Sequence, residues 1–336
     1  MSVTAFDGVV TTLPQPSSRF SRLVRRQGWT FGVAVLLVVL TLWRFSQIPS
    51  VEGFEVRTIT AGTLAFAFLA MGQSVIIISG GIDLSIGANI VFANCLSAMW
   101  MEDQGLGTCV LLGLAVVLIT TALSTLTGLI ITVSGVPDII VTLAASFTLS
   151  GLALFIIGGP GGGTSPDFQR LFVGGFSNYV PSALWMIGAV VLLSIPLRRS
   201  RAGLAIYAVG SDRKAAFLSG VAVARTRVVS YGVGGLLAGF AGVVTTAYTG
   251  GGEPRATIGA NATLNSVAAA VLGGVALTGG VGGLTGPVLA ALCLSLIPAI
   301  MLGLGWDPSN AEIAEGVIII LVVLVAGLLQ SRRRTV

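Results

Sequence analysis

The strongest chemical signal in this sequence is an acidic residue set between glycines, in the string Gly-Gly-Ile-Asp-Leu-Ser-Ile-Gly at 80–87. In so apolar a chain, an ionised carboxylate is costly to bury and by default marks a polar cavity. Asp83 can instead lie in solvent at a tight turn, or cap the helix that follows. The neighbouring glycines would let the backbone open beside a polar path. From this region we predict that a solute path or gate includes Gly80, Gly81, Asp83, Ser85 and Asn89.

A second group of side chains carries amides and hydroxyls within apolar stretches. These groups suit hydrogen bonding to a neutral polyol, and they suit bonding between neighbouring helices equally well. The group comprises Gln73, Asn89, Asn94, Thr142, Ser146, Asn261, Asn265 and Thr278. The members that we add to the predicted path are Asn94, Thr142, Ser146, Asn261 and Asn265.

Several kinds of chemistry are excluded by composition. Histidine is absent, which removes His-based acid–base catalysis and most zinc or iron sites. The one lysine, Lys214, stands between Arg213 and Ala215, so the chain lacks the Gly-Lys-Ser/Thr ending of a phosphate-binding loop. The three cysteines lie in apolar runs without metal-site spacing. The sequence therefore predicts no metal, no cofactor bound by this chain and no enzymatic site.

The elements that must position these residues are membrane spans. Of the 336 residues, 54% are hydrophobic and only 9% are charged, and the mean hydropathy is +0.97. A bilayer core needs about 20 apolar residues per helix, and the chain supplies such stretches almost throughout. We predict an all-α protein with ten spans at 28–47, 58–80, 84–101, 108–133, 138–158, 179–197, 228–249, 263–282, 285–305 and 309–330.

The distribution of basic residues predicts the orientation, because positive charge is retained on the cytoplasmic side. Fourteen of the 18 basic residues lie in the tail 1–27, the loop 198–227 and the tail 331–336. An even number of spans places all three segments in the cytoplasm. The domain organisation that follows is a transmembrane domain at 28–330 with a cytoplasmic tail at each end.

An internal repeat links the two halves. Gly80–Asn89 and Gly252–Asn261 match at an offset of 172 residues and share Ile-Gly-Ala-Asn, and Pro137 matches Pro308 at an offset of 171. Five predicted spans separate the copies, which places them at opposite membrane surfaces and makes the repeats inverted. Inverted repeats with glycine-interrupted helices are typical of transporters. The alternative is that two glycine-rich helix joints are merely alike.

The loop 198–227 contains a short amphipathic segment, Ser211–Val221, which predicts a helix at the inner membrane surface. Such a helix can rest on anionic lipid headgroups or dock into the groove of a partner protein.

Four blocks now accumulate in order: GGIDLSIG (80–87), VPDIIVTLA (136–144), RAGLAIYAVGSDRKAAFLSGV (201–221) and LNSVAAAVLGGVALTGGVGGLTGPVLAA (264–291). With them the chain resembles the transmembrane permease subunits of ribose-type ABC sugar importers, over residues 28–330. The resemblance implies a bacterial inner-membrane permease that moves a small sugar inward by alternating access. It implies as partners an ABC ATPase subunit that uses ATP and magnesium, a second permease copy or paralogue, an extracytoplasmic sugar-binding protein and membrane lipid, with no nucleic acid.

The resemblance also favours partner docking for the cytoplasmic segment. The residues that it assigns to coupling with the ATPase are Gly210, Ser211, Asp212, Arg213, Lys214, Ala215, Ala216, Ser219 and Gly220. Permeases for nucleosides and for furanose-type signalling molecules share the family, so the substrate stays open. Two other classes remain as alternatives. One is an ion-gradient-driven transporter that uses Glu312 or Glu315, and the other is an integral-membrane enzyme.

Overall fold

The computed structural model describes residues 19–47, 53–174 and 180–307, together with several positions between 309 and 324. Within these residues the chain is helical, and its single β-type contact is an isolated bridge between Gly161 and Gly252. The helices described there are α1 (Arg19–Ser46), α2 (Gly53–Ile78), α3 (Ile86–Met101), α4 (Leu106–Ser134), α5 (Asp138–Ile156), α6 (Pro166–Val173), α7 (Val180–Arg199), α8 (Arg201–Ser211), α9 (Arg213–Leu218), α10 (Val223–Thr249), α11 (Ala256–Leu272) and α12 (Thr285–Gly303).

Seven of these helices are long and apolar enough to cross a membrane: α1, α2, α4, α5, α7, α10 and α12. Two more, α3 and α11, are apolar but have only 16 and 17 residues, fewer than the ~20 that a span needs. The prediction of an all-α membrane protein is confirmed. Of the predicted spans that match a described helix, those other than 28–47 and 263–282 coincide with it to within about five residues at either end, and α1 begins nine residues before the predicted start at 28.

The predicted span at 263–282 is wrong at both ends. The helix there, α11, begins at Ala256 and stops at Leu272. Beyond it, Gly274, Gly279 and Gly280 have φ values of 90°, 84° and 71°, a left-handed conformation that an α-helix does not contain. These glycines therefore form a loop between α11 and α12. The predicted span at 309–330 falls largely outside the described residues.

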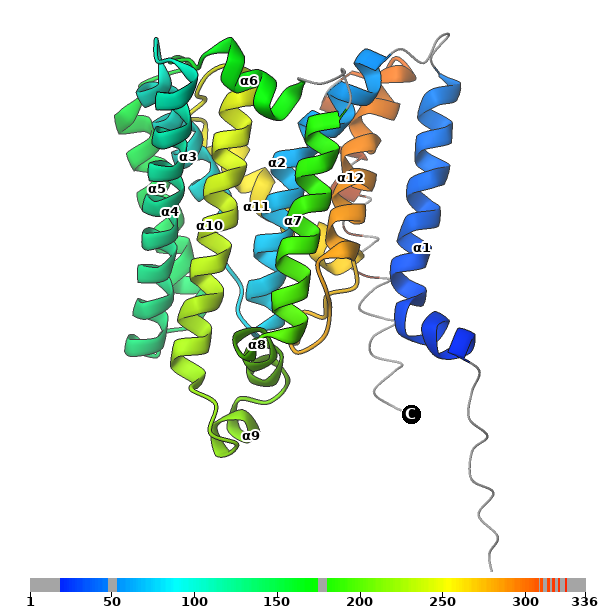
Figure 1. Ribbon diagram of the computed structural model, residues 1–336, viewed down its shortest axis with the longest axis vertical. Coiled ribbons are helices and arrows are strands. Elements are labelled where there is room, and N and C mark those ends of the chain that lie inside the picture. Colours follow the sequence, from blue (N-terminus) through cyan, green and yellow to red (C-terminus); the bar gives the residue numbers. More distant parts are fainter. Residues whose placement is uncertain are drawn as a thin grey trace, which may run out of the picture.

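The long helices stand roughly side by side with α3 and α11 among them, and α6, α8 and α9 lie at the two ends of the bundle (Figure 1). One end carries α8 and α9, and we call it the α9 face. The opposite end carries α6, and we call it the α6 face. At the edge of the bundle, α1 packs along α12, and Trp29 Nε1 donates to the Leu272 carbonyl oxygen at 2.6 Å. This bond fixes the end of α11 to α1.

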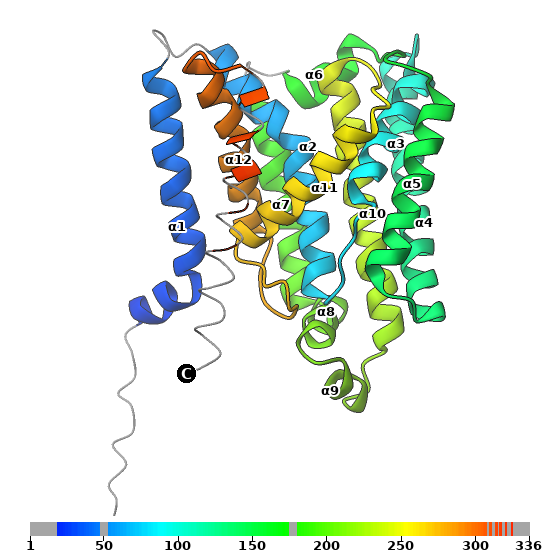
Figure 2. The same cartoon turned by 180° about the vertical axis from the view of Figure 1, so that it is seen from behind.

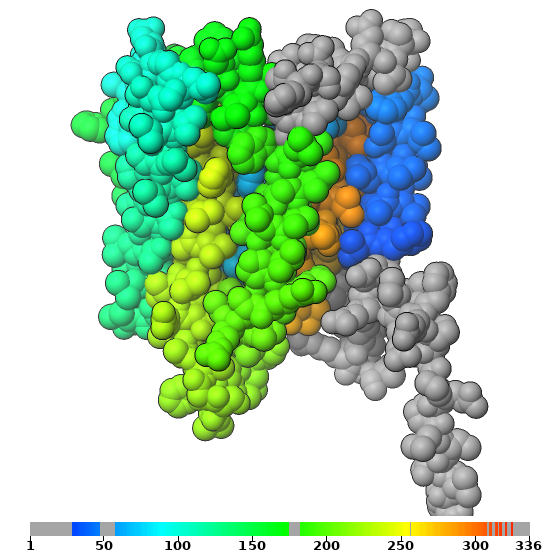
Figure 3. Space-filling view, in the orientation of Figure 1, coloured from blue at the N-terminus to red at the C-terminus, as the bar shows by residue number. Residues whose placement is uncertain are grey.

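The central helix of the bundle is α10, which packs against α2, α3 and α4. Figure 3 shows it on one face between α4 and α7. Glycines along α10 meet α4: a Cβ at Gly239 would overlap Thr120 Oγ1 and lie 3.1 Å from Val117 Cα. Small residues of this kind allow helix backbones to approach closely in a membrane.

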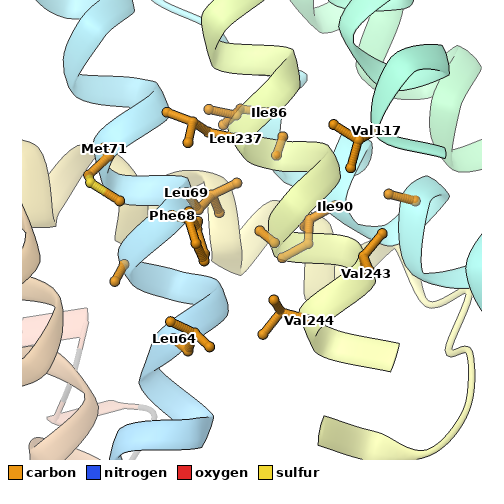
Figure 4. Packing of buried hydrophobic residues seen from close by; sticks show 14 of the residues in the cluster. Leu64, Phe68, Leu69, Met71, Ile86, Ile90, Val117, Leu237, Val243 and Val244 are labelled. Carbon is orange, nitrogen blue, oxygen red and sulfur yellow. The ribbon is translucent and has the colours of Figure 1, made fainter. Parts of the chain in front are cut away.

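The apolar core lies around this helix. Figure 4 shows buried side chains of α2, α3, α4 and α10 gathered in one cluster, with Phe68 and Leu69 projecting from α2 toward α10 and Val243 on the opposite side of α10. Phe68 also stacks on Phe240 with ring centroids 5.9 Å apart. The core holds α2, α3 and α10 as one unit, against which the polar residues are placed.

We expect Gly239→Ala to lower the free energy of unfolding by about 1–3 kcal/mol, because the added methyl overpacks the contact with α4. The measurement is the unfolding midpoint of the purified chain in mild detergent.

The matched control is Gly188→Ala in α7, where a Cβ would meet no atom within 4 Å. That change should leave stability equal or higher, since alanine favours a helix over glycine. Equal losses in both variants would contradict the close-packing explanation.

Candidate functional site

The break between α2 and α3, residues 79–85, places the acidic motif inside the bundle. Asp83 is only 1% exposed, so the expectation that it lies in solvent is wrong. Its Oδ1 accepts from the amide of Ser85 at 2.7 Å and from the hydroxyl of Ser85 at 2.6 Å. Ser85 directly precedes α3. The carboxylate therefore holds the turn from which the helix starts, which is close to the capping role.

The two Ile-Gly-Ala-Asn motifs meet each other at the starts of α3 and α11. The amide of Gly87 donates to Thr263 Oγ1 at 3.0 Å, and the Thr263 hydroxyl donates to the Gly259 carbonyl oxygen at 3.0 Å. A Cβ on Gly87 would overlap that same carbonyl oxygen. The shared motifs thus lie inside the bundle, where α3 and α11 cross (Figure 2), whereas the repeated passages begin at opposite ends, Gly80 beside Arg213 at the α9 face and Gly252 at the turn toward the α6 face.

One buried amide near this crossing retains bonding capacity. Asn89 is fully buried, and its Nδ2 donates to Ser124 Oγ of α4 at 2.7 Å. Its Oδ1 is buried and has no hydrogen-bond partner in the described part of the chain. A buried acceptor without a donor costs about 1–3 kcal/mol, so a hydroxyl reaching this position gains that energy.

Toward the α6 face, Asn94 ties α3 to the turn that follows α10. Its Nδ2 donates to Thr246 Oγ1 at 2.9 Å and to the Gly251 carbonyl oxygen at 3.0 Å, and its Oδ1 accepts from the Glu253 amide at 3.0 Å. The same turn pairs with Gly161 through two main-chain bonds with Gly252 of 2.8 and 3.1 Å. Beside it lies a cavity of about 490 Å³, lined in part by Asn94, Thr249 and Glu253.

At the α9 face, glycines bring three segments into backbone contact. The amide of Gly280 donates to the Ile78 carbonyl oxygen at 2.9 Å, and a Cβ on Gly210 would overlap that oxygen. Arg213 Nη2 donates to the Gly80 carbonyl oxygen at 2.8 Å. The end of α2, the end of α8 and the loop before α12 therefore form one junction.

Tyr207 of α8 fastens the loop before α12, because its hydroxyl donates to the Gly282 carbonyl oxygen at 3.0 Å. Burial raises the pKa of Tyr207 above its ordinary value. The phenol thus stays protonated and able to donate across the neutral pH range.

The predicted amphipathic helix is shorter than expected and is divided. Ser211 ends α8, and α9 runs only from Arg213 to Leu218. Asp212 separates the two helices and caps α9, with Oδ1 accepting from the amides of Lys214 at 2.8 Å and Ala215 at 3.0 Å. Ala216 is buried, and Ser219 and Gly220 form the exposed turn that follows.

An apolar tip projects from α9: Phe217 is 70% exposed and Leu218 is 84% exposed. This pair lies at the end of the bundle, beyond the long helices (Figure 1).

The remaining predicted path residues are dispersed. Thr142 is buried and donates to the Asp138 carbonyl oxygen at 2.8 Å, and Ser146 is half-buried. Asn261 is exposed and Asn265 is half-buried. The structure thus brings Gly80, Gly81, Asp83, Ser85 and Asn89 together at the first break, and it places Asn94 at the opposite end of α3.

Sequence reasoning missed Thr263, Ser124 and Thr246, which bond the path residues from other helices. It also missed Asp138, which forms an ion pair with Arg227. Asp138 lies between apolar stretches within VPDIIVTLA, and a charge in that setting is by default functional. The sequence therefore contained a signal for Asp138, whereas nothing in it distinguished the hydroxyls of Thr263, Ser124 and Thr246 from other hydroxyls.

Taken together, broken helices meet inside a bundle of membrane-crossing helices, and a capped apolar tip stands at one end. These features define a multi-pass membrane permease, with backbone opened beside buried polar groups. The chain belongs to the family described as branched-chain amino acid transport system / permease component, whose model matches residues 56–326.

Curated relatives cover nearly the whole chain. A probable ABC transporter permease protein y4mJ of Sinorhizobium fredii is 32% identical over 91% of this chain and 91% of that protein. The ribose import permease protein RbsC of Escherichia coli K12 is 30% identical over 89% of this chain and 94% of that protein. The autoinducer 2 import system permease protein LsrD of Photorhabdus temperata is 28% identical over 89% and 91%. No solved structure matches the chain.

These relatives confirm the resemblance to ribose-type ABC permeases. They also confirm that the chain is a transport subunit, with ATP hydrolysis assigned to a separate subunit, and not an enzyme.

We expect Asn94→Ala to raise the rate of amide hydrogen exchange at Gly251–Glu253 by about tenfold or more. Without the hydrogen bonds from Asn94, opening of this turn costs less free energy. Exchange followed by mass spectrometry in detergent is the measurement.

Ser97→Ala is the matched control. Ser97 lies one turn further along α3, is fully buried, and has an Oγ without a hydrogen-bond partner in the described chain. Exchange at the turn should stay at the wild-type rate. A similar increase in both variants would show that any change in α3 loosens the turn.

Proposed function

We propose that this chain is the membrane-spanning subunit of an ATP-driven importer that moves a small sugar across the bacterial inner membrane. The observation that carries the proposal is the position of α9. Its tip exposes Phe217 and Leu218, while its first residue, Arg213, bonds the Gly80 carbonyl oxygen at the break. A partner bound to Phe217 and Leu218 is therefore connected through Arg213 to the break at which the proposed path lies.

The partner at the α9 face is an ABC ATPase subunit, which supplies ATP and magnesium chemistry that this chain lacks. An amphipathic helix that projects two large apolar side chains suits a hydrophobic groove. The proposed coupling segment runs from Gly210 to Gly220, with Asp212 setting the start of α9. The α9 face is then cytoplasmic, which agrees with the basic residues of the loop 198–227. With an even number of spans, the proposed orientation also makes both chain termini cytoplasmic.

The α6 face is then extracytoplasmic, where a sugar-binding protein delivers the solute and a second permease copy or paralogue completes the transporter. The cavity lined by Asn94, Thr249 and Glu253 opens near this face. It is the proposed entrance.

Ten spans and inverted repeats complete the architecture. The seven long helices, the short α3 and α11, and the segment 309–330 together make ten. Two observations support the inversion. Gly87 and Gly259, which match at the offset of 172, lie against each other. From that crossing, α3 leads toward the α6 face and α11 toward the opposite one (Figure 2). Alternating access then consists of movement of the two halves about this crossing.

The solute is a neutral sugar in this proposal. Asn89 Oδ1 supplies an unmatched acceptor at the first break. Apart from Asp83, which is bonded to Ser85, the proposed path residues carry amides, hydroxyls or no side chain. The names of the relatives, ribose import and autoinducer 2 import, support a pentose or a furanose-type molecule. Glu312 and Glu315, on which ion-gradient-driven transport would depend, lie outside the described residues.

We expect the double substitution Phe217→Ser with Leu218→Ser to abolish copurification of the ATPase subunit while the permease stays folded. Both side chains are already exposed, so their loss removes docking area without disturbing the core. Pull-down of the tagged chain in mild detergent measures the effect.

Val133→Ser serves as the control, since Val133 is 79% exposed near the same face but lies on α4. Copurification should persist in this variant. If the ATPase subunit still binds the double variant, α9 is not its docking site.

We also expect Asn89→Ala to raise the KM for ribose uptake by about tenfold, the effect of losing one hydrogen bond to the solute. The maximal rate should fall less, because the bonds of Asp83 and Gly87 that fix the start of α3 stay in place. Uptake of labelled ribose by cells that carry the complete transporter gives both constants. Ser97→Ala on the same helix should change neither, and an unaltered KM in Asn89→Ala would remove Asn89 from the path.

A further inference from the structure

Three side chains that the proposed path does not use form a buried cluster at the α9 face. Arg227 of α10 donates to Asp138 in the first turn of α5, with Nη2 lying 2.5 Å from Oδ1 and 2.6 Å from Oδ2. The side chains of Arg227 and Asp138 are 11% and 17% exposed. One turn further along α10, the fully buried Tyr231 donates its hydroxyl to Asp138 Oδ2 at 2.9 Å. The carboxylate thus joins α5 to one face of α10.

The same cluster closes on the main chain of the first break. Tyr231 Oη lies 3.3 Å from the Ile82 carbonyl oxygen. A Cβ on Gly81 would lie 3.0 Å from Tyr231 Oη and 3.1 Å from Asp138 Oδ2. A Cβ would fit there only if its neighbours moved by a few tenths of an ångström, so the two side chains lie directly against residues 81 and 82. Asp83, the buried acid of the break, follows at once.

The segment that carries α9 reaches the break at both of its ends. At the start of α9, Arg213 bonds the Gly80 carbonyl oxygen from an exposed position. After α9, the chain enters α10 at Val223, and Arg227 and Tyr231 lie in its first turns. The first contact is a single solvent-accessible bond, and the second is a buried cluster. A displacement of α9 therefore changes the buried contact through α10 as well as the exposed one.

The cluster belongs to one half of the molecule. At the offset of 171 residues that pairs Pro137 with Pro308, the counterpart of Asp138 is Ser309, which carries no charge. The ion pair is thus not a packing device that both repeats share. It occurs where α10 continues from α9.

We propose that Asp138, Arg227 and Tyr231 form a latch that holds the first break closed toward the α9 face and that opens when the ATPase subunit displaces α9. The inference rests on the proposed function. A buried, hydrogen-bonded ion pair suits this task, because it is strong when both partners are in place and leaves an uncompensated charge when they part. The ion pair therefore favours two discrete conformations of the break, one with the pair formed and one with it separated, over a continuous range of conformations. These residues are positioning residues: they act on the main chain of the break and do not touch the solute.

The test is the accessibility of the break from the α9 face, which requires no knowledge of the sugar. A Ser85→Cys reporter, in a background where the three native cysteines are alanine, is labelled with a membrane-impermeant maleimide. Labelling is done on the complex with its ATPase subunit in inside-out vesicles, with and without ATP. In the parent we expect slow labelling in one nucleotide state and fast labelling in the other.

Tyr231→Phe and Arg227→Gln should both label about fivefold to tenfold faster in the slow state, and so lose most of the nucleotide dependence. Tyr231→Phe removes only the hydroxyl, so this variant still tests the latch if Arg227→Gln does not fold. Arg170→Gln is the matched control, because it breaks an exposed ion pair with Asp167 on the α6 face. The side chain of Arg170 is 70% exposed and that of Asp167 is 65% exposed. Its labelling should equal that of the parent.

Parent-like labelling of folded Tyr231→Phe would overturn the latch. A parent chain that binds no ATPase subunit would instead contradict the proposed function. In that event the labelling rates of the chain alone still report whether the cluster closes the break, so the two failures are distinguishable.

Discussion

The requirement that every main-chain polar group be bonded in the absence of water governs this structure. Helices meet that requirement internally, but the break at 79–85 and the starts of α3 and α11 do not. Side chains from other helices supply what is missing. Thr263 accepts a hydrogen bond from the Gly87 amide, and Asn94 donates to the Gly251 carbonyl oxygen in the turn after α10. Tyr231 and Arg213 donate to carbonyl oxygens of the first break. The bundle is therefore held at its interruptions by hydroxyls, amides and guanidinium groups, and elsewhere by apolar packing.

Close approach of backbones is the second condition, because these short side chains reach only a near neighbour. Gly87, Gly210 and Gly239 each lie where a single methyl would overlap another helix or its side chains. In the proposed mechanism, close contact at these points carries a displacement of α9 to the interior of the bundle. The end of α2, the end of α8 and the loop before α12 have no intervening side chains to absorb a displacement. A rigid junction of that kind transmits movement of one segment to the others.

Hydropathy was enough to predict the membrane class and most helix positions, because a span is defined by its length of apolar sequence. It failed at α11, where the helix starts among polar residues near Ala256 and a loop of apolar composition follows Leu272. Only the conformation of the glycines separates that loop from a helix. The acidic motif and Asn94 were found from residue type alone. Their partners were not, because Ser124, Thr246 and Thr263 differ in no local way from hydroxyls that bond within their own helices.

The contact between Gly161 and Gly252 has a consequence for how the two ends of the molecule respond to their surroundings. It consists of two main-chain hydrogen bonds without any ionisable group. The bonds of this contact therefore do not titrate, whereas the ion pair of Glu253 and Arg255 beside it, with Arg255 70% exposed, is screened by salt. At the opposite end, Arg213 makes an exposed charge-assisted bond, which dissolved salt screens. Dissolved salt therefore weakens the charge-assisted bonds at both ends of the bundle and leaves the main-chain bonds between Gly161 and Gly252 nearly unchanged.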